Sequence, residues 1–77
     1  MATSKDWPAR VKGMLRAELA RRQLSYADLA EKLDAIGVKG DSRNIKNKIG
    51  RGSFTAIFFF QCMDALGVNT IHLRNGD

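Results

Sequence analysis

The segment SRNIKNKIGRGSF, residues 42–54, carries the side chains whose chemistry is most specific. It contains four cations, two asparagines and no acid: Arg43, Asn44, Lys46, Asn47, Lys48 and Arg51. Arginine can form paired hydrogen bonds with guanine and asparagine with adenine, while lysine attracts phosphate. These residue types in one short stretch indicate a surface that binds DNA.

Helical geometry separates these polar side chains from an apolar anchor. At about 100° per residue, Ile45 and Ile49 fall on one side of a helix over residues 42–49. The other side carries Arg43, Asn44, Asn47 and Arg51, with Lys46 and Lys48 on its flanks. A short surface helix that is simply charged and solvated would show the same pattern, so the segment alone leaves both interpretations open.

A first helix is predicted well before this segment, starting after Asp6 as N-cap and with Pro8 in its first turn. Its apolar stripe has helical spacing and consists of Val11, Met14, Leu15 and Leu19. Three arginines of this helix are expected to add positive charge near the cationic segment: Arg16, Arg21 and Arg22.

A second helix is predicted between Ser25, its N-cap, and Gly37, a left-handed stop after which Val38 folds back. Its apolar face is expected to contain Tyr26, Leu29, Ala30, Leu33 and Ile36. The turn VKGD then leads to Asp41, the expected N-cap of the third helix. A helix, a turn containing glycine and a polar basic helix form, in this order, a helix-turn-helix.

The fourth predicted helix follows Ser53, its expected N-cap, begins at Phe54 and stops at Gly67. It has three consecutive phenylalanines, 58–60, which cannot all point into one thin core. An apolar pair beside two polar residues predicts a homodimer interface formed by Ile57, Phe60, Gln61 and Asp64. The alternative is that the first helix or the tail covers Phe60.

The expected fold is all-α, a helix-turn-helix bundle of four to five short helices, because the chain has no alternating strand pattern. Residues 1–77 are expected to form one domain, with flexible termini at 1–6 and 74–77. The tail after Gly67 leaves room for one short extended piece.

Composition narrows the classes of function. The net charge of +5 favours an anionic partner. The chain has one cysteine, Cys62, and one histidine, His72, so we expect no internal disulfide, no metal site and no cofactor. Cys62 is interpreted as core filler and His72 as a structural or surface residue, and no enzymatic activity is expected. Without a signal peptide or membrane span, the expected protein is soluble and cytoplasmic, with no small-molecule ligand evident.

The segments LSYADLAEKL, the cationic helix, GRG and ALGV follow one another in a recognisable order. Over residues 11–73 this order resembles helix-turn-helix domains of the phage-repressor, Cro/cI-like type. The resemblance implies that helix 42–49 enters the DNA major groove, and it also implies a homodimer, which proteins of this type often form. It also implies groove contacts by Arg43, Asn44, Lys46, Asn47 and Arg51, and phosphate near Ser25 and Tyr26.

Two features depart from the phage-repressor pattern. The link DAIGVKGD is longer than usual, and the spacing from Ile45 to the following RG is one residue longer. Both affect how far the third helix protrudes. The chain also resembles a small bacterial family catalogued only as a domain of unknown function, and this resemblance implies no activity.

These observations predict a DNA-binding helix-turn-helix protein, a transcriptional regulator that reads the major groove of duplex DNA with helix 42–49. The alternative is a protein-interaction module that keeps the fold without binding DNA. A contiguous basic face joining the first and third helices would favour DNA, whereas scattered cations would favour the alternative.

Overall fold

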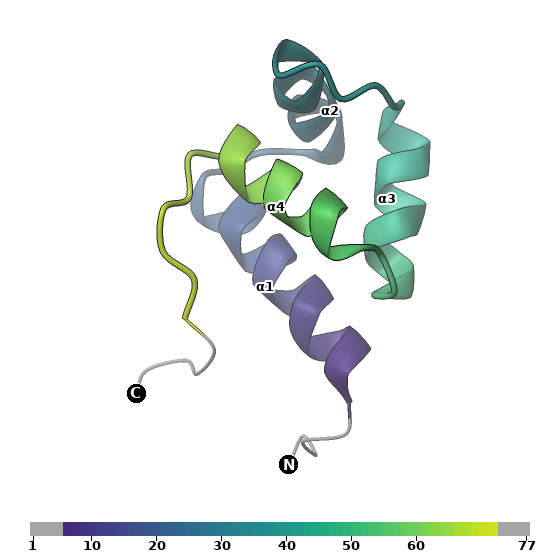
Figure 1. Cartoon of the computed structure of the whole chain (residues 1–77), viewed down its shortest axis with the longest axis vertical. Coiled ribbons are helices and arrows are strands. Elements are labelled where there is room, and N and C mark those ends of the chain that lie inside the picture. Colours follow the sequence, from purple (N-terminus) through teal and green to yellow (C-terminus); the bar gives the residue numbers. More distant parts are fainter. Residues whose placement is uncertain (1–5, 73–77) are drawn as a thin grey trace.

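The computed structural model describes residues 6–72, and these residues form four helices and no strand. The helices are α1 (Trp7–Arg21), α2 (Tyr26–Ala35), α3 (Ser42–Arg51) and α4 (Ala56–Ala65). Figure 1 shows α3 along one edge of the molecule, with α2 above it in that view and α1 and α4 extending away from it. The expectation of an all-α fold with four helices is confirmed.

The core is a single cluster to which every helix contributes. Its buried side chains are Leu15, Leu19, Leu29, Leu33, Ile45, Ile49, Phe58, Cys62, Met63 and Leu66. Helix α2 packs against α3 and α4, and α1 packs against α3. Ile36, predicted on the buried face of the second helix, is instead 43% exposed. Helix α2 ends at Ala35, so the turn that follows carries Ile36 away from the core.

The predicted N-caps of the first three helices are confirmed. The carboxylate of Asp6 accepts a hydrogen bond from the N–H of Ala9 at 3.3 Å, and that of Asp41 accepts one from Asn44 at 2.8 Å. Ser25 and Asp28 form a reciprocal capping box at the start of α2. Each cap satisfies N–H groups that have no partner inside the helix, so these starts are determined locally.

The glycine stops of α2 and α4 are confirmed too. Gly37 and Gly67 both have positive φ, 85° and 76°. The N–H of Val38 bonds the carbonyl of Leu33 at 2.9 Å, and the N–H of Val68 bonds that of Met63 at 2.8 Å. These are the hydrogen bonds of the Schellman motif. Residues 66–72 add no further helix or strand. Residues 1–5 and 73–77 lie outside the described chain, and they include all of the expected flexible terminus 74–77 and all but residue 6 of the expected terminus 1–6.

The connection between α3 and α4 differs from the prediction. Helix α3 continues through Gly50 to Arg51, and Gly52 ends it in the left-handed conformation. Helix α4 starts at Ala56 and not at Phe54, because the hydroxyl of Thr55, rather than Ser53, accepts the N–H of Phe58 at 3.0 Å. Phe54 is thus a connecting residue, half-buried against the core.

Candidate nucleic-acid interface

A polar groove lies between the N-terminal end of α2 and the exposed side of α3. Its volume is about 600 Å³, and its lining consists of Ser25, Tyr26, Ala27, Ser42, Arg43, Lys46 and Asn47. Five of the eight residues predicted to contact DNA are therefore brought together. Three come from α3, and the other two, Ser25 and Tyr26, lie at the start of α2, at least 17 residues earlier in the chain.

The other three predicted residues lie outside this groove, although all are exposed: Asn44, Lys48 and Arg51. The ammonium of Lys48 lies 4.7 Å from the centre of the Phe58 ring, a cation–π contact that turns it toward α4. The cationic segment therefore has two flanks. One, with Arg43, Lys46 and Asn47, faces the start of α2, and the other faces α4.

The N-terminal end of α2 opens at the groove, because its N-cap and first two residues belong to the lining. Unpaired N–H groups and the helix dipole favour an anion at such an end. Asp28 opposes this attraction in part. The N–H of Ser25 and then its hydroxyl lower the pKa of Asp28, so the carboxylate is charged near neutral pH. The hydroxyl of Ser25 accepts a hydrogen bond from the N–H of Asp28 at 3.1 Å.

Helix α1 contributes cations beside the start of α2 and the last turn of α3. The Nε of Arg16 donates to the hydroxyl of Tyr26 at 3.3 Å, and the ammonium of Lys12 donates to the carbonyl of Gly50 at 3.3 Å. The two other arginines expected near the cationic segment, Arg21 and Arg22, pair with Glu18. A direct hydrogen-bond link thus joins α1 to the groove through Arg16.

The residues of the predicted dimer interface differ in exposure. Ile57 is 70% exposed and Phe60 is 63% exposed, Asp64 is also exposed, and Gln61 is half-buried. A surface hollow of about 350 Å³ is lined by Phe60, Met63, Asp64, Val68, Asn69 and Ile71. The tail reaches this hollow through Ile71 but leaves most of the Phe60 ring in solvent. Neither the first helix nor the described part of the tail covers Phe60.

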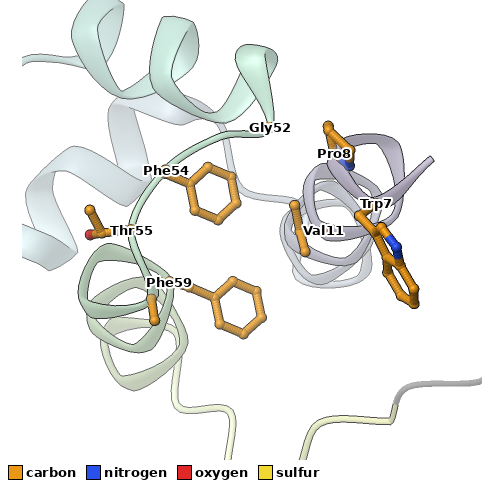
Figure 2. A pocket seen from close by; sticks show the side chains of 8 residues that line it. Trp7, Pro8, Val11, Gly52, Phe54, Thr55 and Phe59 are labelled. Atoms are coloured by element: carbon orange, nitrogen blue, oxygen red, sulfur yellow. The ribbon is translucent and has the colours of Figure 1, made fainter. Parts of the chain in front are cut away.

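An apolar pocket of about 360 Å³ lies between the start of α1 and the α3–α4 connection. Its lining is Trp7, Pro8, Val11, Gly52, Phe54, Thr55, Ala56 and Phe59. Figure 2 shows the rings of Phe54 and Phe59 pointing toward Val11. These rings are nearly parallel, with centroids 6.2 Å apart. The lining has no ionisable side chain, and its polar side-chain groups are the hydroxyl of Thr55 and the indole N–H of Trp7.

Sequence reasoning missed this apolar pocket because its walls are about forty residues apart in the chain. The contact that closes it, between Gly52 and Pro8, is tight. A Cβ placed on Gly52 would lie 2.6 Å from the carbonyl oxygen of Pro8, so the end of α3 rests directly against the first turn of α1. The only advance signal was the glycine at position 52 together with aromatic residues near both segments.

Cys62 and His72 form no reactive pair. Cys62 is fully buried, and burial raises the pKa of its thiol to about 12, which keeps it protonated near neutral pH. Its interpretation as core filler is confirmed. His72 is exposed. Within residues 6–72, no group of three or more His, Cys, Asp or Glu side chains has a spacing that could hold a metal ion.

The fold and this site together define a small, basic all-α domain with a polar groove between two helices. A family model described as "Domain of unknown function (DUF6471)" matches residues 7–71, and the chain belongs to that family. The resemblance to a family known only as a domain of unknown function is thereby confirmed. Comparisons with curated proteins and with solved structures gave no match. No helix in the described part of the chain is long and apolar enough to cross a membrane.

Proposed function

We propose that this protein binds duplex DNA as a helix-turn-helix domain of the Cro/cI-like type and regulates transcription. In this proposal α3 enters the major groove and the start of α2 lies against the phosphate backbone. The observation that carries the proposal is the polar groove, in which Arg43, Lys46 and Asn47 face Ser25 and Tyr26. Residues of this chemistry from two helices converge on one surface.

The anchoring of α3 supports the proposal. Ile45 and Ile49 are 3% and 0% exposed, so the opposite side of the helix projects outward. Arg43 and Asn47 are four residues apart and therefore lie one above the other on that side. Arginine pairs with guanine and asparagine with adenine, so this pair suits base contacts. Lys46 beside them suits a phosphate contact.

Homodimerisation through α4 is part of the same proposal. Two copies that bury Ile57 and Phe60 against each other would form an isologous interface, each patch meeting its own copy. A two-fold dimer also presents two α3 helices, and DNA-reading dimers of this kind contact half-sites about 34 Å apart.

A second candidate function is a protein-interaction module with no role in DNA binding. The observation that favours it is the amount of exposed apolar surface. Trp7, Ile57 and Phe60 are 57%, 70% and 63% exposed, and the apolar pocket beside Trp7 has room for a side chain. Under this function the cations of α3 would serve only solubility.

The deciding experiment measures binding of a random-sequence duplex by fluorescence anisotropy over a range of salt concentrations. If about four to six phosphates are neutralised, log K should fall with log salt at a slope of about −4 to −5. Lys46→Ala should reduce that slope by about 0.9. Lys39→Ala is the charge-matched control, because Lys39 pairs with Asp34 and does not line the groove. A protein that binds no duplex at low salt would contradict the proposal and favour the second candidate.

A further inference from the structure

We propose that Arg16 and Tyr26 form a phosphate clamp that extends the DNA contact from α2 and α3 onto α1. The clamp would hold one phosphodiester group of the duplex backbone. This inference rests on the proposed function and assigns a role to an α1 residue that lies outside the polar groove itself.

The first support is the position of Arg16 between three helices. Its Nε donates to the hydroxyl of Tyr26, which lines the polar groove. A Cβ placed on Gly50 would lie 4.0 Å from one terminal nitrogen of the same guanidinium. Arg16 therefore spans from the first turn of α2 to the last turn of α3, along the edge of the predicted DNA surface.

The second support comes from the partners of the cationic side chains of α1 between residues 12 and 22. Arg21 and Arg22 both pair with Glu18, and Arg22 also donates to the carbonyl of Leu66 at 3.1 Å. The ammonium of Lys12 is part-buried against the carbonyl of Gly50, where it stabilises the negative end of α3. Arg16 is exposed, and the ion pairs within residues 6–72 involve Arg21, Arg22 and Lys39 but not Arg16. Its charge is therefore available to an external anion.

The third support is the set of hydrogen-bond donors that Arg16 and Tyr26 still have after they bond to each other. A guanidinium has five N–H donors, and the bond to Tyr26 uses one of them. The hydroxyl of Tyr26 accepts that bond and keeps its own hydrogen to donate. A planar guanidinium fork and an adjacent O–H match the two non-bridging oxygens of a phosphodiester, which share one negative charge. The bond to Tyr26 also holds the guanidinium in place, which reduces the ordering that binding requires.

The experiment compares the 77-residue chain with four variants, using one random-sequence duplex over a range of salt concentrations. Arg16→Ala should weaken binding roughly tenfold at low salt, as expected for a lost charged hydrogen bond, and should reduce the salt slope by about 0.9. Tyr26→Phe and Arg16→Lys should weaken binding less and keep the wild-type slope, because the charge remains. Arg21→Ala is the matched control and should leave both quantities nearly unchanged.

The outcomes separate this inference from the proposed function. If the wild type binds but Arg16→Ala behaves like Arg21→Ala, the clamp is wrong and the proposed function stands. If the wild type binds no duplex, both are wrong. Circular dichroism checks the fold of each variant. Should Arg16→Ala not fold, Arg16→Gln removes the charge while its amide can still bond Tyr26, and an unchanged slope for that variant overturns the clamp.

Discussion

The two isoleucines of α3 determine which way its polar side chains face. Ile45 and Ile49 are buried one turn apart, while the residues that alternate with them remain exposed. A helix of ten residues is too short to be stable alone in water, so this packing supplies most of its stability. The direction in which Arg43 and Asn47 project is thus a consequence of core packing.

Replacing Asn47 by alanine should separate binding specificity from folding. Asn47 is exposed in the polar groove, so Asn47→Ala should leave the helix content and the melting temperature nearly unchanged. A good bidentate base contact contributes about 1–3 kcal/mol of discrimination, and that discrimination should be lost. Competition between a selected site and random duplex measures it. Equal preference of wild type and variant would show that Asn47 does not read a base.

The matched control for Asn47 is Ile49, two residues later. Its side chain is fully buried, and truncation leaves a cavity. Ile49→Ala should lower the free energy of unfolding by about 2–5 kcal/mol, measured by urea denaturation. A small change at Ile49 together with unfolding at Asn47 would mean that the assigned orientation of α3 is wrong.

At the scale of the elements, the helix starts and stops that depend on neighbouring residues were predictable. Asp6, Ser25 and Asp41 cap three helices, and Gly37 and Gly67 end two, because each acts within four or five residues. The start of α4 was not predictable in this way. Ser53 and Thr55 are both good caps, and the packing of Phe54 against the core favours Thr55.

The candidate site also has parts that could be predicted from the sequence and parts that could not. The outward face of α3 followed from helical spacing, so Arg43, Lys46 and Asn47 were found from the sequence. The partners of the α1 arginines depend on where each side chain lies in three dimensions. Arg21 and Arg22 both pair with Glu18, whereas Arg16 donates to the hydroxyl of Tyr26. The apolar pocket depends on a contact between Pro8 and Gly52, which no local pattern encodes.

The capping box of α2 should make stability depend on pH. The hydrogen bonds from Ser25 lower the pKa of Asp28 in the folded protein, so its stabilisation is complete above the unfolded value, near 4. That stabilisation is lost as pH falls through the lower folded value. Between neutral pH and pH of about 3, the melting temperature of the Asp28→Asn protein should therefore fall by less than that of the wild type. Glu31→Gln, which removes an exposed carboxylate of the same helix, is the control and should behave like the wild type.

The contact between α1 and the end of α3 should be sensitive to one methyl group. Gly52 has φ of 67° and no room for a Cβ beside Pro8, whereas Gly37 has φ of 85° and open space. Gly37→Ala should cost about 1 kcal/mol or more from its backbone conformation alone. Gly52→Ala carries the same backbone cost, and its methyl group must also displace the backbone of α1. The decrease in the free energy of unfolding, measured by urea denaturation, should therefore be clearly larger for Gly52→Ala than for Gly37→Ala. Equal losses would show that the contact with Pro8 yields easily.

At the scale of the whole molecule, polar and apolar surfaces belong to different elements. The polar groove lies between α2 and α3, and the most exposed large apolar side chains lie on α4 and at the start of α1. Such a division lets one domain use α3 for a nucleic acid while α4 contacts a second protein chain. The proposed dimer is therefore compatible with DNA binding.

The dimer proposal predicts that Phe60→Glu gives a folded monomer with much weaker DNA binding. Leaving Ile57 and Phe60 in solvent forgoes about 25 cal/mol for each Å² of apolar area that an interface would bury. In a two-fold interface the substitution places two carboxylates close together, whereas in the monomer the side chain is already 63% exposed and should tolerate the change. Light scattering gives the mass and circular dichroism the helix content.

Ala20→Glu adds the same charge at an exposed position of α1 and should remain dimeric. A wild type that stays monomeric at high micromolar concentration would rule the interface out, and a Phe60→Glu protein that unfolds would assign Phe60 to the core.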